Sequence, residues 1–332
     1  MDGWWQRLLF ERERLWRVIR LSAFAGTPFV TAGLFACGPC PEEDHIFLLR
    51  APDAQVQQLV DLCQKPQRDC EPLCRHLVRG EFLVAESQVL AHCELHGDRE
   101  GYLRVHVGWR EHCPGGRRPE GLRLPNVQDD ASEVGAWLGT LAALEAASVP
   151  AFERLAMELA AHDAPPSLVR AALAAARDEV IHARMGARLA ERYGVRAQQP
   201  GVPAFEGVRR LDEILAENAV EGCVREAYGA VSAAHQASTA GDPFVRRAFR
   251  RIADDESRHA ALGLAVDCWG RTKLSAKARQ RLRQEKELAV DLLLAETAIV
   301  PSLACTATLG LPPPELSHRM VMMLREETCD RA

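Results

Sequence analysis

Four glutamates recur at nearly even intervals through the C-terminal two thirds of the chain, and two of them are followed by histidine three positions later. They are Glu145, Glu179-x-x-His182, Glu221 and Glu256-x-x-His259, and the glutamates are separated by 34, 42 and 35 residues. Each lies in a stretch that we expect to form a long helix, so each helix would place its carboxylate at one common level. Four inward carboxylates and two imidazoles are the ligands of a dinuclear metal site in a four-helix bundle.

The Glu-x-x-His motif is short, so its spacing carries the argument. It occurs four times in the sequence. The other two copies, Glu42-x-x-His45 and Glu315-x-x-His318, follow prolines and lie outside the series of long helices. We interpret these two copies as chance matches or solvated polar residues.

Apolar or small residues surround each of the four glutamates at helical spacings of three, four and seven residues. Phe152 shares a face with Glu145, and Ala176 shares one with Glu179. A single glutamate on such a face is usually paired with arginine or lies at the rim of a bundle, but four at one level with two histidines favour a metal site. The face of Glu221 is more polar, and Glu217 or Glu226 could take its place.

The ligand types indicate which metals would bind. Carboxylate oxygens with one imidazole per metal suit iron or manganese, with zinc as a further alternative, and bridging carboxylates hold two such ions about 3.5–4 Å apart. Each histidine is expected to donate its other ring N–H to a second acceptor, for which Asp178 and Asp255 are candidates. Tyr228 is predicted either to line the access route or to be an ordinary core residue.

Long alanine-rich amphipathic stretches predict the helices that would position these ligands. Pro150 lies inside the first of them and predicts a kink or a local break. The predicted helices cover residues 131–161, 167–194, 207–239, 243–270, 275–299 and 313–327.

The first forty residues have the form of an export signal. A net-positive stretch from Arg7 to Arg20 precedes an uncharged run from Leu21 to Ala36. The sequence Leu34-Phe35-Ala36-Cys37 resembles a bacterial lipoprotein signal, which implies lipid on Cys37 and an exported protein of the cell envelope, in the outer membrane or facing the periplasm. An uncleaved anchor and a buried N-terminal helix are the alternatives.

Six of the 11 cysteines crowd into the segment that follows. This density predicts a small disulfide-stapled α+β module in an oxidising compartment, with a strand at 102–107, although buried thiols are an alternative. Cys37-Gly38-Pro39-Cys40 has the residues of a thioredoxin redox motif but lacks the strand and helix that such a motif needs. Cys305 and Cys329 could tie down the C-terminal tail. The six cysteines are Cys40, Cys63, Cys70, Cys74, Cys93 and Cys113.

Composition and texture divide the chain into four parts. The net charge of −5 and the lack of a Lys/Arg stripe give no support to nucleic-acid binding. We predict a mainly α fold, in which a four-helix bundle follows the small Cys-rich α+β module. The parts are a signal peptide at 1–36, the Cys-rich module at 37–127, the bundle at 128–272 and additional C-terminal helices at 273–332.

The ligand set resembles the di-iron site of the ferritin-like superfamily, which includes bacterioferritin and rubrerythrin. The resemblance covers roughly residues 131–270, and the whole chain is similar to bacterial lipoproteins with a ferritin-like domain. It implies that Glu179 and Glu256 bridge two iron ions, with Glu145 and Glu221 as terminal ligands. It also implies that His182 and His259 bind one ion each.

Three functions are compatible with this sequence. The first is a membrane-tethered di-iron or di-manganese protein that reacts with O2 or peroxide, as an oxidase, ferroxidase or peroxide scavenger. The second is a non-catalytic metal-binding protein of the cell envelope. The third is a structural lipoprotein that uses the bundle as a scaffold.

Overall fold

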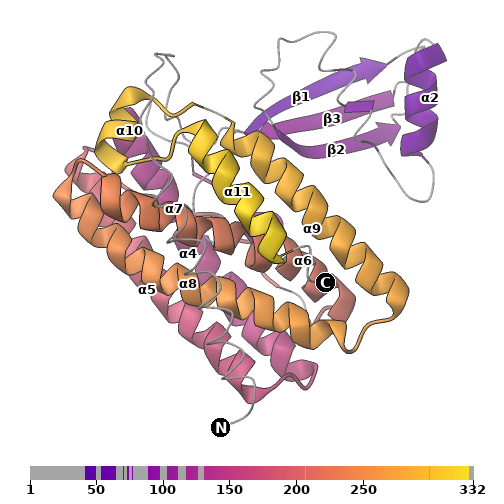
Figure 1. The fold of residues 1–332 in the computed structure, drawn as a ribbon. Helices are drawn as coiled ribbons and strands as arrows, with labels where there is room; N and C mark the ends of the chain where they lie inside the picture. The colour runs from indigo at the N-terminus through magenta and orange to yellow at the C-terminus, as the bar shows by residue number, and fades with distance from the viewer. Residues whose placement is uncertain are drawn as a thin grey trace. The chain divides into compact units, whose positions relative to one another are not determined.

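A computed structural model describes residues 42–49, 54–64, 89–97, 103–110, 117–125 and 131–328 apart from 206 and 299, with residues 70, 73, 74 and 77. The described chain is mainly helical, as predicted. It divides into two compact units, residues 40–112 and a unit containing residues 113–332, which we call the sheet unit and the helical unit (Figure 1). The expected signal peptide and Cys37 lie outside the described residues.

The sheet unit holds three antiparallel strands and a helix. The strands are β1 (Glu42–Leu49), β2 (Val89–Gly97) and β3 (Leu103–Arg110), and the helix is α2 (Ala54–Cys63). β3 lies in the centre and pairs with both other strands. The strand predicted at 102–107 is therefore confirmed as part of β3.

Two disulfides join the elements of the sheet unit. Cys63, at the end of α2, is bonded to Cys70, and Cys74 is bonded to Cys93 on β2. They border a small core whose innermost side chains include Val60, Leu73 and Val105. A unit of this size buries few apolar groups, so covalent links contribute much of its stability. Cys40 and Cys113 lie outside the described residues.

The helical unit contains two helical hairpins. The first consists of α4 (Glu133–Ala161) and α5 (Pro166–Arg192), which pack against each other. The second consists of α6 (Leu211–Val220), the π-helical turn η1 (Glu221–Arg225), α7 (Glu226–Thr239) and α8 (Pro243–Arg271). Helix α7 packs on α8, and α5 lies beside α8, which joins the two hairpins (Figure 1).

Capping residues and prolines set the ends of these helices. The Ser132 hydroxyl accepts a hydrogen bond from the backbone N–H of Gly135, and the Asp242 carboxylate accepts one from that of Phe244. Pro166 and Pro243 lie in the first turn, where a backbone N–H has no partner within the helix. The predicted helices agree with the observed ones to within a few residues, except that the third is divided by η1.

Helix α4 continues through Pro150. Proline removes one backbone hydrogen bond from a helix interior, but 20 residues of α4 are buried against the rest of the unit. Packing along the whole helix therefore holds it together on both sides of the proline. The break considered from the sequence does not occur.

The C-terminal helices pack on both hairpins of the helical unit. They are α9 (Ala276–Thr297), α10 (Leu303–Leu309) and α11 (Pro314–Thr328), of which α10 was not predicted. Polar contacts fasten them to η1, α7 and α8, so they belong to the same unit. These contacts are Arg225 with Glu296 at 2.6 and 2.9 Å, Lys286 Nζ with Asp267 Oδ2 at 2.7 Å, and the Tyr228 hydroxyl donating to Ser317 Oγ at 3.2 Å. Cys305 is disulfide-bonded, whereas Cys329 lies outside the described residues.

Residues Arg117 and Arg118, which we call the Arg117 strap, cross from α4 to the second hairpin. The Arg117 carbonyl accepts a hydrogen bond from the Ser148 hydroxyl on α4 at 3.0 Å. Its guanidinium is 1% exposed and contacts Glu217 on α6 at 3.2 Å. The backbone N–H of Arg118 donates to Glu221 Oε2 at 3.0 Å. The strap therefore holds α4, α6 and η1 together.

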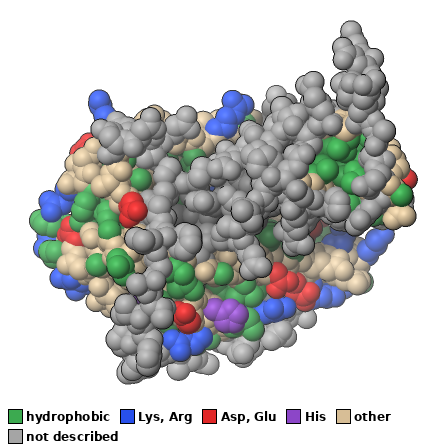
Figure 2. All heavy atoms as spheres, turned by 90° about the horizontal axis from the view of Figure 1, so that it is seen from above, with side chains coloured by type: hydrophobic (Ala, Val, Ile, Leu, Met, Phe, Trp, Pro, Cys, Tyr) green, Lys and Arg blue, Asp and Glu red, His purple; other side chains and the backbone are tan. Residues whose placement is uncertain are grey.

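Three hydrophobic clusters lie in the described helical unit, and two of them lie at different levels along its long helices. One includes Leu138, Leu141 and Phe249, and the other includes Phe152, Leu155 and Leu262. The glutamates and histidines singled out in the sequence lie between these levels. They are buried, whereas charged side chains of both signs are interspersed over the described part of the face in Figure 2.

Among the described helices, α4 alone is long and apolar enough by composition to cross a membrane. Within the structure, 83% of its most apolar window is buried. It packs against α5 and carries Glu145 in its middle. These contacts are those of a core helix in the helical unit.

Candidate metal centre

Six buried side chains from four helices converge in the helical unit. They form two groups, and within each group the potential ligand atoms lie within 4.8 Å of one another. Both groups contain Glu179 and Glu256. The first group is Glu145, Glu179, His182 and Glu256, and the second is Glu179, Glu226, Glu256 and His259.

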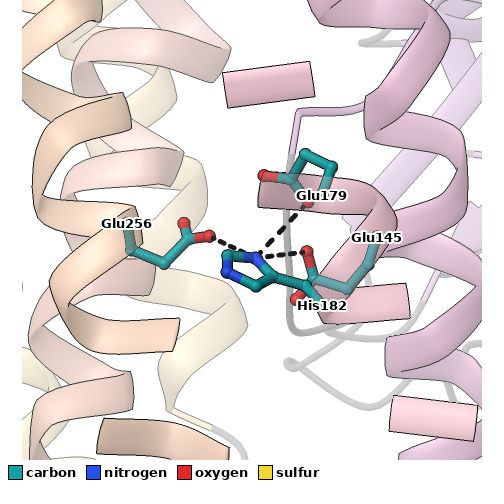
Figure 3. Close-up of side chains that lie close together, drawn as sticks. All are labelled: Glu145, Glu179, His182 and Glu256. Carbon is teal, nitrogen blue, oxygen red and sulfur yellow. Dashed lines mark ion pairs between the residues drawn. The ribbon is translucent and has the colours of Figure 1, made fainter. Parts of the chain in front are cut away.

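The first group surrounds one ring nitrogen of His182 (Figure 3). Nδ1 lies 3.7 Å from Glu145 Oε2, 3.7 Å from Glu179 Oε2 and 3.5 Å from Glu256 Oε1. These distances are too long for good hydrogen bonds. Ligand atoms about 2.1 Å from a tetrahedral ion lie about 3.4 Å from one another, which is close to the distances from Nδ1 to these three oxygens.

The second group surrounds Nδ1 of His259 in the same way. This nitrogen lies 3.0 Å from Glu179 Oε1, 3.5 Å from Glu256 Oε1 and 3.7 Å from Glu226 Oε2. The two oxygens of Glu179 therefore face different histidines, Oε2 toward His182 and Oε1 toward His259. Glu256 Oε1 is equally distant from both rings.

The outer nitrogens of both histidines face aspartates on the opposite hairpin. Nε2 of His182 on α5 lies 3.0 Å from Asp255 Oδ2 on α8. Nε2 of His259 on α8 lies 3.5 Å from Asp178 Oδ2 on α5. The two aspartates considered from the sequence are therefore in place to orient the rings, although the contact of Asp178 is the longer one.

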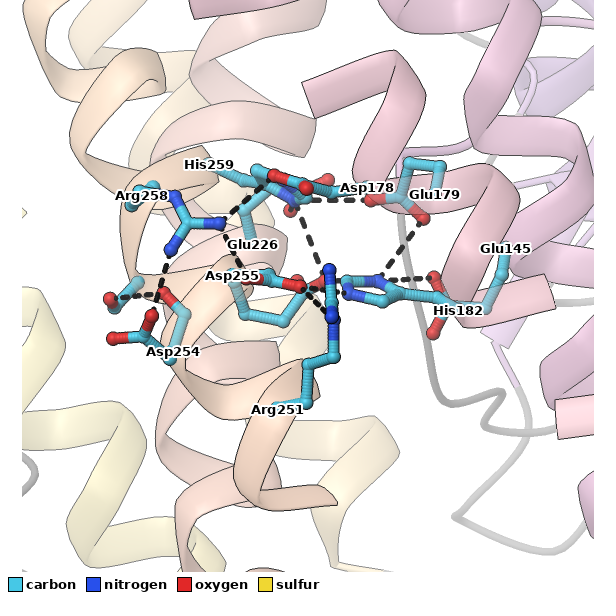
Figure 4. A network of polar contacts seen from close by, with 12 residues as sticks. Glu145, Asp178, Glu179, His182, Glu226, Arg251, Asp254, Asp255, Arg258 and His259 are labelled. Carbon is cyan, nitrogen blue, oxygen red and sulfur yellow. Dashed lines mark hydrogen bonds and ion pairs between the residues drawn. The ribbon is translucent and has the colours of Figure 1, made fainter. Parts of the chain in front are cut away.

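Arg258 connects these two aspartates (Figure 4). Its Nη2 lies 3.1 Å from Asp178 Oδ2 and also donates to Asp255 Oδ1. A chain of polar contacts thus runs from His182 through Asp255, Arg258 and Asp178 to His259. Arg251 contacts only Asp255 within this chain, at 3.3 Å.

Burial and charge act in opposite directions on the pKa values of the cluster. Burial raises the pKa of Glu145 and of Glu226 well above the ordinary value. Burial also opposes ionisation of Glu179 and Glu256, but the nearby imidazoles of His182 and His259 outweigh it and lower the pKa values of both carboxyls. Without a metal, Glu145 and Glu226 therefore hold their protons to a higher pH than a free glutamate does.

Burial and nearby charges also act in opposite directions on the pKa values of the imidazoles and of the outer aspartates. Burial would lower the pKa of each histidine, but the surrounding carboxylates outweigh it and raise both values. Burial would raise the pKa of Asp255, but contacts with His182 and Arg258 outweigh it and lower that pKa to about 2. A metal ion must displace the protons on its ligands, so its affinity is expected to rise with pH.

The chemistry of the donor atoms fits a metal ion. Carboxylates buried without partners are costly, and a cation offsets that cost. Oxygen donors with imidazole suit iron, manganese or zinc. The buried atoms without a hydrogen-bond partner in the described structure include Glu145 Oε2, both oxygens of Glu179 and of Glu226, Glu256 Oε1, His182 Nδ1 and both ring nitrogens of His259.

Glu226 occupies the place that the sequence analysis gave to Glu221. Glu221 belongs to neither group, since its Oε2 accepts from the Arg118 backbone and its Oε1 lies 3.7 Å from Arg225 Nε. The cause is η1, a wide turn in which the backbone N–H of Glu226 bonds to the carbonyl of Glu221. In a regular α-helix residues five apart point about 140° away from each other, and a wide turn changes that register.

The two hairpins share a longer motif than the one first noticed. Asp178-Glu179-x-x-His182-Ala183-x-x-Gly186 on α5 matches Asp255-Glu256-x-x-His259-Ala260-x-x-Gly263 on α8. The aspartate, alanine and glycine of this repeat are a sequence signal that the shorter motif leaves out.

Each glycine of the repeat lies where its helix approaches a neighbour closely. A Cβ on Gly186 would lie 3.1 Å from Cα of Ala142 on α4. A Cβ on Gly263 would lie 2.4 Å from the carbonyl oxygen of Gly222 on η1. Both contacts lie one turn from a histidine of the cluster, so the repeat positions the backbones as well as the ligands.

Tyr228 lies in a hydrophobic cluster with residues of α9 and α11. Its hydroxyl donates to Ser317, and burial raises its pKa to about 12. These contacts are those of a core tyrosine, the second of the two interpretations given above.

No family model, no curated protein and no solved structure matches the chain. The geometry of the cluster therefore carries the functional argument.

Proposed function

We propose that the helical unit is a ferritin-like four-helix bundle that holds two metal ions, with iron as the physiological metal and O2 or peroxide as its reactant. α4, α5, the η1–α7 segment and α8 each supply at least one ligand. His182 and Glu145 would belong to one ion, and His259 and Glu226 to the other. Glu179 and Glu256 would bridge the two.

The single observation that carries the proposal is the orientation of Glu179. Its two carboxylate oxygens face two different imidazoles, at 3.7 Å for His182 and 3.0 Å for His259. A carboxylate that serves one ion would direct both oxygens, or only one, toward a single position. The split orientation supports a bridging role.

The surrounding residues would hold and shield the centre. A bound pair of iron ions supplies two-electron redox chemistry toward O2 or peroxide. Asp255 and Asp178 would fix the ring orientation of the histidines. The hydrophobic clusters on either side exclude water along the helix axes, which strengthens the electrostatic attraction between the carboxylates and cations.

A metal-holding protein without turnover is the second candidate. Glu179, Glu226 and His182 have fully buried side chains, which would slow metal exchange and favour retention. Tight zinc binding without reaction with O2 would support this second function.

We further propose that the chain is an envelope lipoprotein with lipid on Cys37. The support is the signal-like sequence before that cysteine and the disulfide bonding of the sheet unit, which suits an oxidising compartment. Mass spectrometry of the mature protein tests this proposal, because a lipoprotein lacks residues 1–36.

Metal analysis of the full chain tests the proposed centre. We expect two iron ions per chain and an oxo-bridge absorbance band that bleaches on reduction. Glu226→Gln should lose one ion, whereas the matched variant Glu221→Gln should keep both, because Glu221 contacts the Arg117 strap and Arg225 instead. Equal metal loss in the two variants, or a wild-type chain that binds no metal, would refute the assignment.

A further inference from the structure

Asn218 on α6 lies three residues before η1, and its side chain is fully buried. Its Nδ2 donates a hydrogen bond to the Gly263 carbonyl on α8 at 2.9 Å. A buried amide needs such partners, and Arg117 Nη1 lies 3.5 Å from the other end of this amide, Oδ1. The Gly263 carbonyl lies inside α8, where the backbone N–H four residues later is its usual partner, so Asn218 uses the second lone pair. Asn218 therefore holds α6 to a helix that carries two of the ligands.

The same carbonyl is the point where η1 meets α8. Cys223 Sγ donates to it at 3.5 Å. A Cβ on Gly222 would lie 3.0 Å from Gly263 Cα and 2.5 Å from Asn218 Oδ1, so the two segments touch through their backbones. Gly263 follows His259 by one helical turn on α8. The contact therefore lies next to the second group of the metal centre.

The wide turn of η1 depends on such contacts, because its own five residues, Glu-Gly-Cys-Val-Arg, contain no proline that would interrupt a regular helix. A π-helical turn is rare. Loss of its extra residue would rotate every later side chain of α7 by about 100°. Glu226 directly follows η1, so the wide turn sets the direction of its carboxylate.

Other contacts hold η1 to segments without ligands. Its start contacts the Arg117 strap, and its last residue, Arg225, contacts Glu296 on α9. Neither the strap nor α9 supplies a ligand to the two groups. The hydrogen bond from Asn218 ends on α8, which supplies a ligand to both. It therefore fixes the wide turn relative to the ligands themselves.

We propose that Asn218 is a positioning residue that fixes η1 against α8 and thereby holds Glu226 in the second group of the metal centre. This inference rests on the proposed metal centre and assigns one of its two ions to the amide. The unshared ligands of the first group lie on α4 and α5, which are continuous helices. Loss of the amide should therefore remove one ion and leave the other.

Cobalt binding to the full chain tests this proposal. Asn218→Ala deletes the amide, and Gln236→Ala is the matched control. Gln236 on α7 is 2% exposed, and its Nε2 donates to the Leu309 carbonyl on α10 at 3.2 Å. The control therefore removes the same kind of hydrogen bond between helices, about three helical turns beyond η1. We expect one cobalt ion per chain after dialysis for Asn218→Ala, and two for the wild type and for Gln236→Ala.

The thiol of Cys223 reports the position of η1 without metal. Its side chain is fully buried, and burial raises its pKa to about 12, so it reacts slowly until η1 moves away from α8. Alkylation of the metal-free chains by iodoacetamide is followed by mass spectrometry of the peptide that contains Cys223. The rate should rise about tenfold in Asn218→Ala, since one buried hydrogen bond corresponds to that factor in an opening equilibrium. It should change by less than about twofold in Gln236→Ala, where η1 keeps its contacts.

The outcomes separate this inference from the proposed function. A wild-type chain without metal refutes both. If the wild type holds two ions, the positioning role alone is refuted when Asn218→Ala also keeps two, or when Gln236→Ala loses an ion as well. Support requires both the loss of one ion and faster alkylation of Cys223 in Asn218→Ala. Asn218→Asp keeps the size of the side chain but not the donor, so it replaces the alanine variant if that variant does not fold, and every other combination of results overturns the proposal.

Discussion

The two hairpins of the helical unit carry the same motif on α5 and α8. They differ in the segment that supplies the remaining glutamate of each group. Glu145 extends from the continuous helix α4, whereas Glu226 directly follows the π-helical turn η1. Phe152 on α4 packs 5.1 Å from the ring of His259 on α8, so the first hairpin also covers the second histidine. The repeat places matching ligands on both hairpins, whereas the described irregular backbone beside the centre belongs to the second hairpin.

The largest expected effect is on the number of bound metal ions, and it distinguishes ligands that belong to both groups from ligands that belong to one. Glu179→Ala should lose both metal ions, because Glu179 belongs to both groups. Glu145→Ala should lose only the ion of the first group. Metal content per chain after dialysis checks this difference, and equal stoichiometry in the two variants would contradict the shared role of Glu179.

A smaller effect is expected from the arginines outside the cluster. Arg258 contacts both Asp178 and Asp255, so Arg258→Ala should lower metal affinity about 10–100-fold in both halves. Arg251 contacts Asp255 alone and its side chain is 51% exposed, so Arg251→Ala should change affinity by less than about fivefold.

Competition with a chelator gives these affinities, and the absorption spectrum of the cobalt-loaded protein reports ring orientation. A spectrum unchanged in Arg258→Ala would show that Arg258 does not position the histidines.

The last prediction concerns folding stability at the two glycine contacts. Gly263→Ala should destabilise the metal-free protein by about 2–3 kcal/mol, because the new methyl would overlap the Gly222 backbone of η1. Gly186→Ala should cost about 1 kcal/mol, since its contact with Ala142 is longer. Urea denaturation followed by circular dichroism measures both losses, and a larger loss for Gly186→Ala would contradict the expected order of the two contacts.

Regular helices made most of the cluster predictable from the sequence. Residues of one α-helix keep a fixed angular relation, so Glu179 and His182 had to share a face once α5 was recognised. The described groups contain Glu226 and not Glu221, because η1 changes the helical register. A single wide turn of this kind leaves no mark in hydrophobic periodicity. Glu226 was named only as an alternative.

Other features depend on contacts between distant segments. A segment rich in glycine and proline gave no reason to expect the Arg117 side chain to be buried, since that burial needs Glu217 and Asn218 on α6 as partners. The continuity of α4 through Pro150 likewise depends on the packing of the whole helix. The mainly helical fold was predictable, whereas these contacts were not.

The Arg117 strap has a consequence for dissecting the chain. Its atoms form hydrogen bonds or an ion pair with Ser148, Glu217 and Glu221, which lie on three segments of the helical unit. A fragment that starts at residue 128 would lack the Arg117 strap. Glu217 on α6 and Glu221 on η1 would then each lose a polar contact. A fragment that keeps these contacts therefore begins before residue 117, within the stretch that composition alone assigned to the preceding module.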